Sequence, residues 1–120
     1  MTQPKGLAGQ RILIVEDDYF IAFDLVTTLE AAGVRVVGPA ASLSEALDLV
    51  AQGDRLDGAI LDINLQGEMV YPLVDVLKAR DVAVVFASGY GRHDIPIRYT
   101  DVPLCEKPIQ SQKVASLMFG

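Results

Sequence analysis

Cysteine, histidine and tryptophan are nearly absent from this chain, which has one Cys, one His and no Trp in 120 residues. The lone Cys105 excludes an internal disulfide and a metal site built from several thiolates. No apolar run approaches the roughly 20 residues of a membrane-spanning helix. The first residues also lack the apolar core of a signal peptide. We therefore expect a protein of the reducing cytoplasm with no membrane segment.

Basic residues are also scarce, with ten Lys and Arg against 16 Asp and Glu, and the net charge is −6. The basic residues are scattered and form no stripe, so nucleic acid is not expected as a direct partner. A composition of 51% hydrophobic and 22% charged residues is typical of a folded globular protein. We expect a flexible N-terminal segment over residues 1–9, where Pro and Gly occur, and one folded domain over residues 10–120.

Four short apolar runs each lead directly into polar side chains. Continuous apolar runs of this length are typical of parallel strands that are covered on both faces. Residues that follow such strands lie at their carboxyl ends, where open α/β sheets place their chemistry. The runs are 12–15 before Glu16 and Asp17, 59–61 before Asp62, 82–87 before Ser88, and 104–106 before Lys107.

Helical spacing of apolar residues fills most of the stretches between these runs. We expect helices at 18–32, with Ile21 on the buried face, at 42–53, near Pro72 and at 109–118. A further strand is expected at 34–37, closed by Gly38-Pro39, and a loop at 64–68. The alternation of strands and helices predicts parallel βαβ units with right-handed crossovers.

The predicted fold class is therefore α/β, a doubly wound five-stranded parallel sheet of order 2-1-3-4-5 in a flavodoxin-like three-layer α/β/α arrangement. One stretch departs from the alternation. Between Ser88 and the last strand, two glycines and two prolines interrupt the place where a fourth helix belongs. We predict that this fourth helix is short or disordered, as a single turn or an irregular, mobile loop.

The strand order reverses between the first and third strands, which places Glu16, Asp17 and Asp62 in one crevice. Three crowded carboxylates repel one another unless a cation neutralises them. Because all candidate ligands are oxygen atoms, the favoured cation is Mg²⁺. Asp62 has the central position and is the candidate nucleophile towards a phosphoryl group.

The neighbouring strands supply groups that suit a transferred phosphoryl group, which needs positive charge and hydrogen-bond donors on its oxygens. Ser88 offers a hydroxyl one strand from Asp62. Lys107 lies two strands away, about 10 Å at 4.8 Å per strand, a distance that only a long side chain can cover. Each residue alone has a structural explanation, and for Asp18 the role of helix N-cap is the favoured one. The coincidence of four strand ends on one edge favours an active site.

These motifs resemble a receiver domain of a two-component response regulator, and the similarity covers essentially the whole chain. The resemblance implies that Asp62 accepts a phosphoryl group from a sensor histidine kinase. It also implies that Mg²⁺ is held by Glu16, Asp17, Asp62 and the backbone carbonyl of Asn64. Ser88 and Lys107 would contact the phosphoryl group, and the Lys107-Pro108 bond would be cis. The matching residues are Ile14-Val15-Glu16-Asp17-Asp18, Leu61-Asp62, Ala87-Ser88-Gly89 and Glu106-Lys107-Pro108.

A narrower likeness is to stand-alone alphaproteobacterial receivers with a Phe-Ala-Thr-Gly-Tyr signature, which reads Phe86-Ala87-Ser88-Gly89-Tyr90 here. That group resembles this chain in its shortened or disordered fourth helix, and it is associated with HWE-type kinases and stress signalling. Most receivers carry an aromatic switch residue three positions before the lysine, where this chain has Leu104. We hypothesise that Tyr90 or Tyr99 takes over that role.

Three functional interpretations stay open. The first is a phosphorylation switch, not an enzyme, that ends at Gly120 without an output domain and acts by binding a protein target, competing for a kinase or passing the phosphoryl group onward. The second is a Mg²⁺-dependent phosphatase, which would place an Asp-x-Asp nucleophile where Glu16-Asp17-Asp18 stands. The third is a flavin-binding module, which would need a glycine- and hydroxyl-rich loop at that position. Turnover of phosphomonoesters or a bound flavin would favour the second or third.

Overall fold

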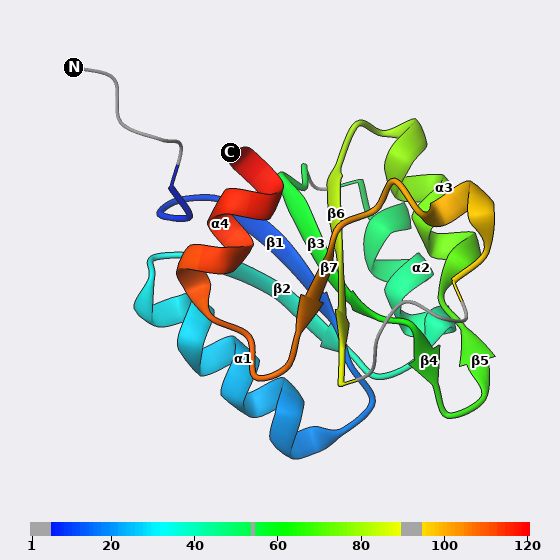
Figure 1. The fold of residues 1–120 in the computed structure, drawn as a ribbon, viewed down its shortest axis with the longest axis horizontal. Coiled ribbons are helices and arrows are strands. Elements are labelled where there is room, and N and C mark those ends of the chain that lie inside the picture. The colour runs from blue at the N-terminus through cyan, green and yellow to red at the C-terminus, as the bar shows by residue number, and fades with distance from the viewer. Residues whose placement is uncertain (1–5, 54, 90–94) are drawn as a thin grey trace.

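A computed structural model describes residues 6–53, 55–89 and 95–120 of the chain. Five parallel strands in the order β2-β1-β3-β6-β7 lie between two layers of helices (Figure 1). The predicted fold class and strand order are thereby confirmed. The strands of this sheet are β1 Arg11–Val15, β2 Arg35–Ala40, β3 Gly58–Asp62, β6 Ala83–Ser88 and β7 Leu104–Glu106. The helices are α1 Tyr19–Ala31, α2 Leu43–Ala51, α3 Tyr71–Ala79 and α4 Ser111–Phe119.

The central strands bury both of their faces, which explains why they are apolar without interruption. Alternate residues of a strand point to opposite faces. Ile14 and Ile60 accordingly pack in the layer with α1 and α4, whereas Val15 and Leu61 pack in the layer with α2 and α3. All four side chains are at most 1% exposed. The sheet is therefore a rigid platform whose carboxyl edge carries the polar residues.

The helix starts follow the expected capping chemistry. The Asp18 side chain accepts hydrogen bonds from the backbone N–H groups of Phe20 and Ile21, so Asp18 caps α1 as predicted. Ser42 caps α2 through the N–H of Glu45. On the buried face of α1, the prediction for Ile21 is wrong: this residue is 37% exposed, and Ala22 is buried in its place.

The second strand extends further than predicted. β2 runs through Gly38-Pro39 to Ala40, because the chain forms a bulge there instead of a turn. Leu13 pairs with Val37, whereas Val15 pairs with Ala40, so β2 has one extra residue over this interval. The Glu16 N–H then donates to the Ala40 carbonyl at 2.9 Å. The bulge thus fixes the backbone at the end of β1, where the carboxylates begin.

The expected loop at 64–68 is instead a small hairpin of β4 Asn64–Leu65 and β5 Glu68–Met69. Its two turn residues, Gln66 and Gly67, have φ values of 55° and 94°, as a type I′ turn requires. The side chain of Asn64 stabilises the turn, since its Oδ1 accepts a hydrogen bond from the N–H of Gly67 at 2.6 Å. The hairpin carries the chain from the end of β3 to the start of α3.

In place of a fourth helix, the described part of the segment before β7 contains one 3₁₀ turn, η1 Ile97–Tyr99. This agrees with the predicted short turn, while Tyr90 lies outside the described residues. Of the segment expected to be flexible, residues 1–5 also lie outside the described part, whereas Leu7 is buried in the core. Among the described residues, no helix combines the length and apolar character needed to cross a membrane.

The bulge in β2 predicts a large cost for Gly38→Ala. A Cβ atom at Gly38 would lie 2.8 Å from the Ala40 nitrogen and 2.9 Å from the Ile14 carbonyl oxygen, and φ is +93°. Backbone atoms cannot move aside cheaply, so we expect the free energy of unfolding to fall by about 3 kcal/mol or more in urea titrations. Gly53→Ala is the matched control.

Gly53 has a similar φ of +86°, yet a Cβ there would meet nothing within 4 Å. We expect this control to lose only about 1 kcal/mol. Equal losses for the two variants would show that close backbone contact at the bulge does not matter.

Candidate functional site

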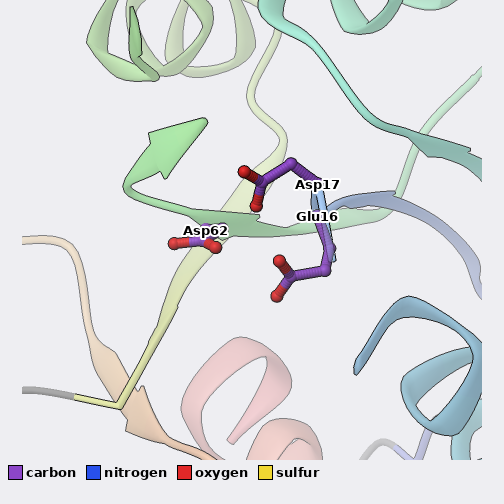
Figure 2. A group of neighbouring side chains, drawn as sticks. All are labelled: Glu16, Asp17 and Asp62. Carbon is purple, nitrogen blue, oxygen red and sulfur yellow. The ribbon is translucent and has the colours of Figure 1, made fainter. Parts of the chain in front are cut away.

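The carboxylates that the sequence predicted as a cluster do lie together. Glu16 and Asp17 follow β1, and Asp62 is the last residue of the adjacent β3. One carboxylate oxygen from each of the three residues lies within 4.8 Å of the others. Figure 2 shows the two side chains from the end of β1 and the one from β3 turned toward a common space. All three atoms are oxygen, the donor type that suits Mg²⁺.

Glu16 is the most deeply buried member of the cluster, with 2% of its side chain exposed. One of its oxygens, Oε1, lies 2.7 Å from the Lys107 Nζ, and the other, Oε2, accepts the Asp18 N–H at 3.1 Å. A buried carboxylate is tolerated only when it is paired in this way. Both oxygens of Glu16 are therefore engaged, which fixes its position at the base of the site.

Lys107 joins the opposite sides of the site. It follows β7, and its Nζ contacts Glu16 and also lies 3.4 Å from Asp62 Oδ2. Burial lowers the pKa of Lys107, but the hydrogen bond to Glu16 and the charges of Asp62 and Glu16 outweigh it, so the pKa lies above its ordinary value. The lysine is thus a firmly protonated cation. The Lys107-Pro108 peptide bond is cis, as the resemblance implied.

Asp17 is the least neutralised of the three acids. Burial raises its pKa, and the hydrogen bond with Glu16 and the charge of Glu16 raise it further, although Lys107 acts in the opposite direction. Three carboxylates thus surround a single ammonium group. When all are ionised, the cluster has more negative charge than Lys107 neutralises, which favours the binding of a further cation.

Ser88 and Asn64 lie beside Asp62 at the end of β3. Asp62 pairs with Ala87 in the register of β3 and β6, so Ser88 stands one residue further out at the same edge. The Ser88 carbonyl accepts the Lys107 N–H at 2.9 Å, which ties the lysine backbone to the end of β6. The Asn64 N–H points to Asp62 Oδ1 at 3.4 Å. Every residue predicted for the site therefore lies at this one edge of the sheet.

Sequence reasoning missed two features of the site. It predicted that Lys107 contacts a phosphoryl group. It did not predict the 2.7 Å contact of Lys107 with Glu16, which is shorter than the 3.4 Å contact with Asp62. It also missed the Asp18 N–H that holds the second oxygen of Glu16. The signal was available, since the cap at Asp18 turns the backbone directly after the two acids.

Cys105 is buried, and burial raises the pKa of its thiol, as expected for a residue of the core.

Comparison with known proteins gives a consistent result. The family model of the response regulator receiver domain matches residues 12–115. The phyllosphere-induced regulator PhyR of Methylorubrum extorquens is 32% identical over 110 residues, which are 89% of this chain. This chain spans about two fifths of that relative, 41% of its length.

Solved structures agree with this match. The solution structure of SdrG from Sphingomonas melonis has a TM-score of 0.78 and 38% identity, over 90% of this chain and 92% of that chain. The response regulator PhyR from Brucella abortus has a TM-score of 0.73 and 26% identity, over 93% of this chain and 47% of that chain. Both are similar in fold and, at these identities, in sequence.

The Lys107–Glu16 pair predicts a large stability loss for Lys107→Met. Removal of the ammonium leaves a buried carboxylate without its counter-charge, so we expect the free energy of unfolding to fall by about 3 kcal/mol at neutral pH. Lys78→Met is the control, because the Lys78–Asp101 pair is as short, at 2.8 Å, but exposed. Its expected loss is below about 1 kcal/mol. Urea titrations that rank the two variants equally would contradict this account of Glu16.

The raised pKa of Asp17 predicts that Asp17→Asn stabilises the metal-free protein. An acid with a raised folded-state pKa contributes stability below its ordinary value of 3.8, and that contribution is lost as the pH rises through the folded-state pKa. The side-chain amide of the variant does not ionise, so the variant does not lose stability as the pH rises. We therefore expect Asp17→Asn to be more stable than the wild type at pH 7, with the difference vanishing below about pH 3.8.

The measurement is thermal unfolding across this pH range in the presence of a chelator. Asp48→Asn controls for the loss of one negative charge, since Asp48 is an exposed residue of α2. A variant at Asp17 that is less stable than the wild type at pH 7 would refute the claim that burial and Glu16 disfavour the ionised carboxylate.

Proposed function

The chain belongs to the response regulator receiver domain family, and we propose that it is a phosphoacceptor switch in which Asp62 takes a phosphoryl group from a sensor histidine kinase. The observation that carries this proposal is the convergence of three carboxylates and one ammonium group at the end of β3. Lys107 lies 3.4 Å from Asp62 as well as 2.7 Å from Glu16, so an incoming phosphoryl group would meet a nucleophile and a counter-charge together.

In the proposed transfer, an oxygen of the Asp62 carboxylate bonds to phosphorus while the P–N bond of the donor phosphohistidine breaks. The histidine ring leaves with the electron pair of that bond and takes up a proton. Lys107 remains protonated and shifts its contact from Glu16 to an oxygen of the phosphoryl group. The Ser88 hydroxyl, one strand over, donates to another oxygen of that group.

The residues present fit Mg²⁺, because the cluster offers only oxygen ligands and carries surplus negative charge. Asp17, Asp62 and the backbone carbonyl of Asn64 would hold the ion directly. Glu16 would be the fourth ligand. Its Oε1 also pairs with Lys107 and its Oε2 accepts the Asp18 N–H, so Glu16 would position the lysine as well as bind the ion. When bound, Mg²⁺ neutralises negative charge on the carboxylates and on the phosphoryl oxygens.

The expected partners are proteins. Beside the site, α1 exposes the aromatic side chains of Tyr19, Phe20 and Phe23. A groove lined by Phe20 and Lys107, among others, adjoins them. Exposed apolar surface of this kind is typical of protein–protein contacts. A histidine kinase, of the HWE type, is the proposed phosphodonor, and a downstream protein target or a phosphotransfer partner would receive the signal.

One relative of solved structure is described as the PhyR stress response regulator, which supports a role in stress signalling. The phosphatase alternative is less favoured. Its nucleophile would follow β1, where Glu16 is buried against Lys107 and Asp18 caps α1. We therefore propose a signalling protein that is modified once and is not an enzyme with turnover.

The test is incubation with Mg²⁺ and a small phosphodonor such as acetyl phosphate, followed by intact mass spectrometry. We expect the wild type to gain one phosphoryl group and Asp62→Asn to gain none. Asp81→Asn, which removes an exposed aspartate at the other edge of the sheet, should be labelled like the wild type. Chelation of Mg²⁺ should lower labelling of the wild type by at least about tenfold, because the metal supplies several kcal/mol of charge stabilisation.

Labelling that persists in Asp62→Asn would move the acceptor to another residue. Continuous release of phosphate from phosphomonoesters would favour the phosphatase.

A further inference from the structure

Tyr99 is fixed to α3 by a set of contacts that we call the Tyr99 latch, made by Tyr71, Asp75, Arg98 and Tyr99. The buried Tyr99 hydroxyl lies 3.0 and 3.1 Å from the two carboxylate oxygens of Asp75. The same carboxylate accepts from Arg98 at 2.9 Å. The guanidinium carbon of Arg98 lies 4.9 Å from the centre of the Tyr99 ring. Figure 1 shows the segment that precedes β7 running beside α3, as these contacts require.

The latch is half polar and half aromatic. The Tyr99 ring stacks on the Tyr71 ring, with centroids 4.6 Å apart and an angle of 13° between the planes. Burial raises the pKa of Tyr99, and its hydrogen bond to Asp75 raises it further, so the hydroxyl stays protonated and donates. The Arg98 and Asp75 side chains are 68% and 45% exposed. Exposed ion pairs are weak, so the polar contacts of the latch can be lost while the Tyr99 ring stays in the core.

Tyr71 connects the latch to both strands that carry the acceptor site. Its ring meets that of Phe86 edge to face at 6.2 Å, and Phe86 lies two residues before Ser88 on β6. On the other side, the residue before Tyr71 donates its N–H to the Ile63 carbonyl at 3.0 Å, directly after Asp62. A displacement of either strand end therefore reaches the Tyr71–Tyr99 stack through direct contacts. In β7, by contrast, Leu104 offers no ring to report such a displacement.

We propose that the Tyr99 latch holds residues 95–102 in the resting arrangement and that phosphorylation of Asp62 loosens it through Tyr71. The proposal rests on the proposed function of Asp62. The polar contacts of the latch are exposed and weak, so a displacement of the Tyr71 ring breaks them first, and the change that phosphorylation brings about is their opening. Linkage is reciprocal: if the phosphoryl group favours the open latch, a weakened latch must favour binding of a phosphoryl mimic.

The experiment uses the whole chain with Mg²⁺ and beryllofluoride, which mimics an aspartyl phosphate, followed by ¹⁵N amide spectra. In the wild type, we expect the amide resonances of residues 95–102 to shift together with those of Asp62 and Lys107. Tyr99→Phe keeps the ring and loses only the hydroxyl. Without the mimic, the amide resonances of this variant over 95–102 should lie closer to those of the mimic-bound wild type. Its apparent affinity for the mimic should be about fivefold higher than that of the wild type.

Asp101→Asn is the matched control. It breaks the exposed Lys78–Asp101 pair, which ties the same segment to the same helix at 2.8 Å, while the latch residues are unchanged. We expect wild-type shifts and affinity for this variant. Site shifts without any change over 95–102, or a Tyr99→Phe protein with wild-type affinity, would overturn the latch alone. The absence of shifts at Asp62 and Lys107 would overturn the proposed function, and the latch with it.

Discussion

The buried ion pair between Glu16 and Lys107 is the contact on which the arrangement of the site depends. It joins residues 91 positions apart in the chain, one after the first strand and one after the last. In the strand order observed here, β3 and β6 lie between those two ends, so the pair spans the edge where Asp62 and Ser88 stand. A carboxylate with 2% of its side chain exposed must be paired. The pair therefore fixes the distance across which the Asp62 carboxylate, Ser88 and the Lys107 ammonium group lie at this edge.

The same arrangement leaves the cluster with more negative than positive charge. Lys107 offers one ammonium group to three carboxylates, and burial together with the neighbouring Glu16 raises the pKa of Asp17. The continuous burial of β1, β3 and β6 provides a core that tolerates such a costly group at one edge. The surplus negative charge favours a bound cation at this edge of the sheet.

Much of the fold and the site followed from patterns within short stretches of sequence. The uninterrupted apolar runs predicted buried parallel strands, and the polar residues directly after them predicted the edge at which Glu16, Asp17, Asp62, Ser88 and Lys107 meet. What could not be predicted depends on contacts between distant segments. Gly38-Pro39 looks like a strand end, and only pairing with β1 shows that it is a bulge. Gln66 carries no signal for a positive φ, so the hairpin was missed. Tyr99 and Asp75 lie 24 residues apart in segments without a shared period, so nothing local indicated their hydrogen bond.

The central claim is that the carboxylates at the end of β1 and β3 form one site for a divalent cation, and calorimetric titration with Mg²⁺ in the absence of any phosphodonor tests it most directly. The account predicts one saturable site per chain, and an affinity at least about tenfold lower in Asp17→Asn, with Asp81→Asn unchanged. Binding that is absent from the wild type, or that is the same in all three proteins, would contradict it.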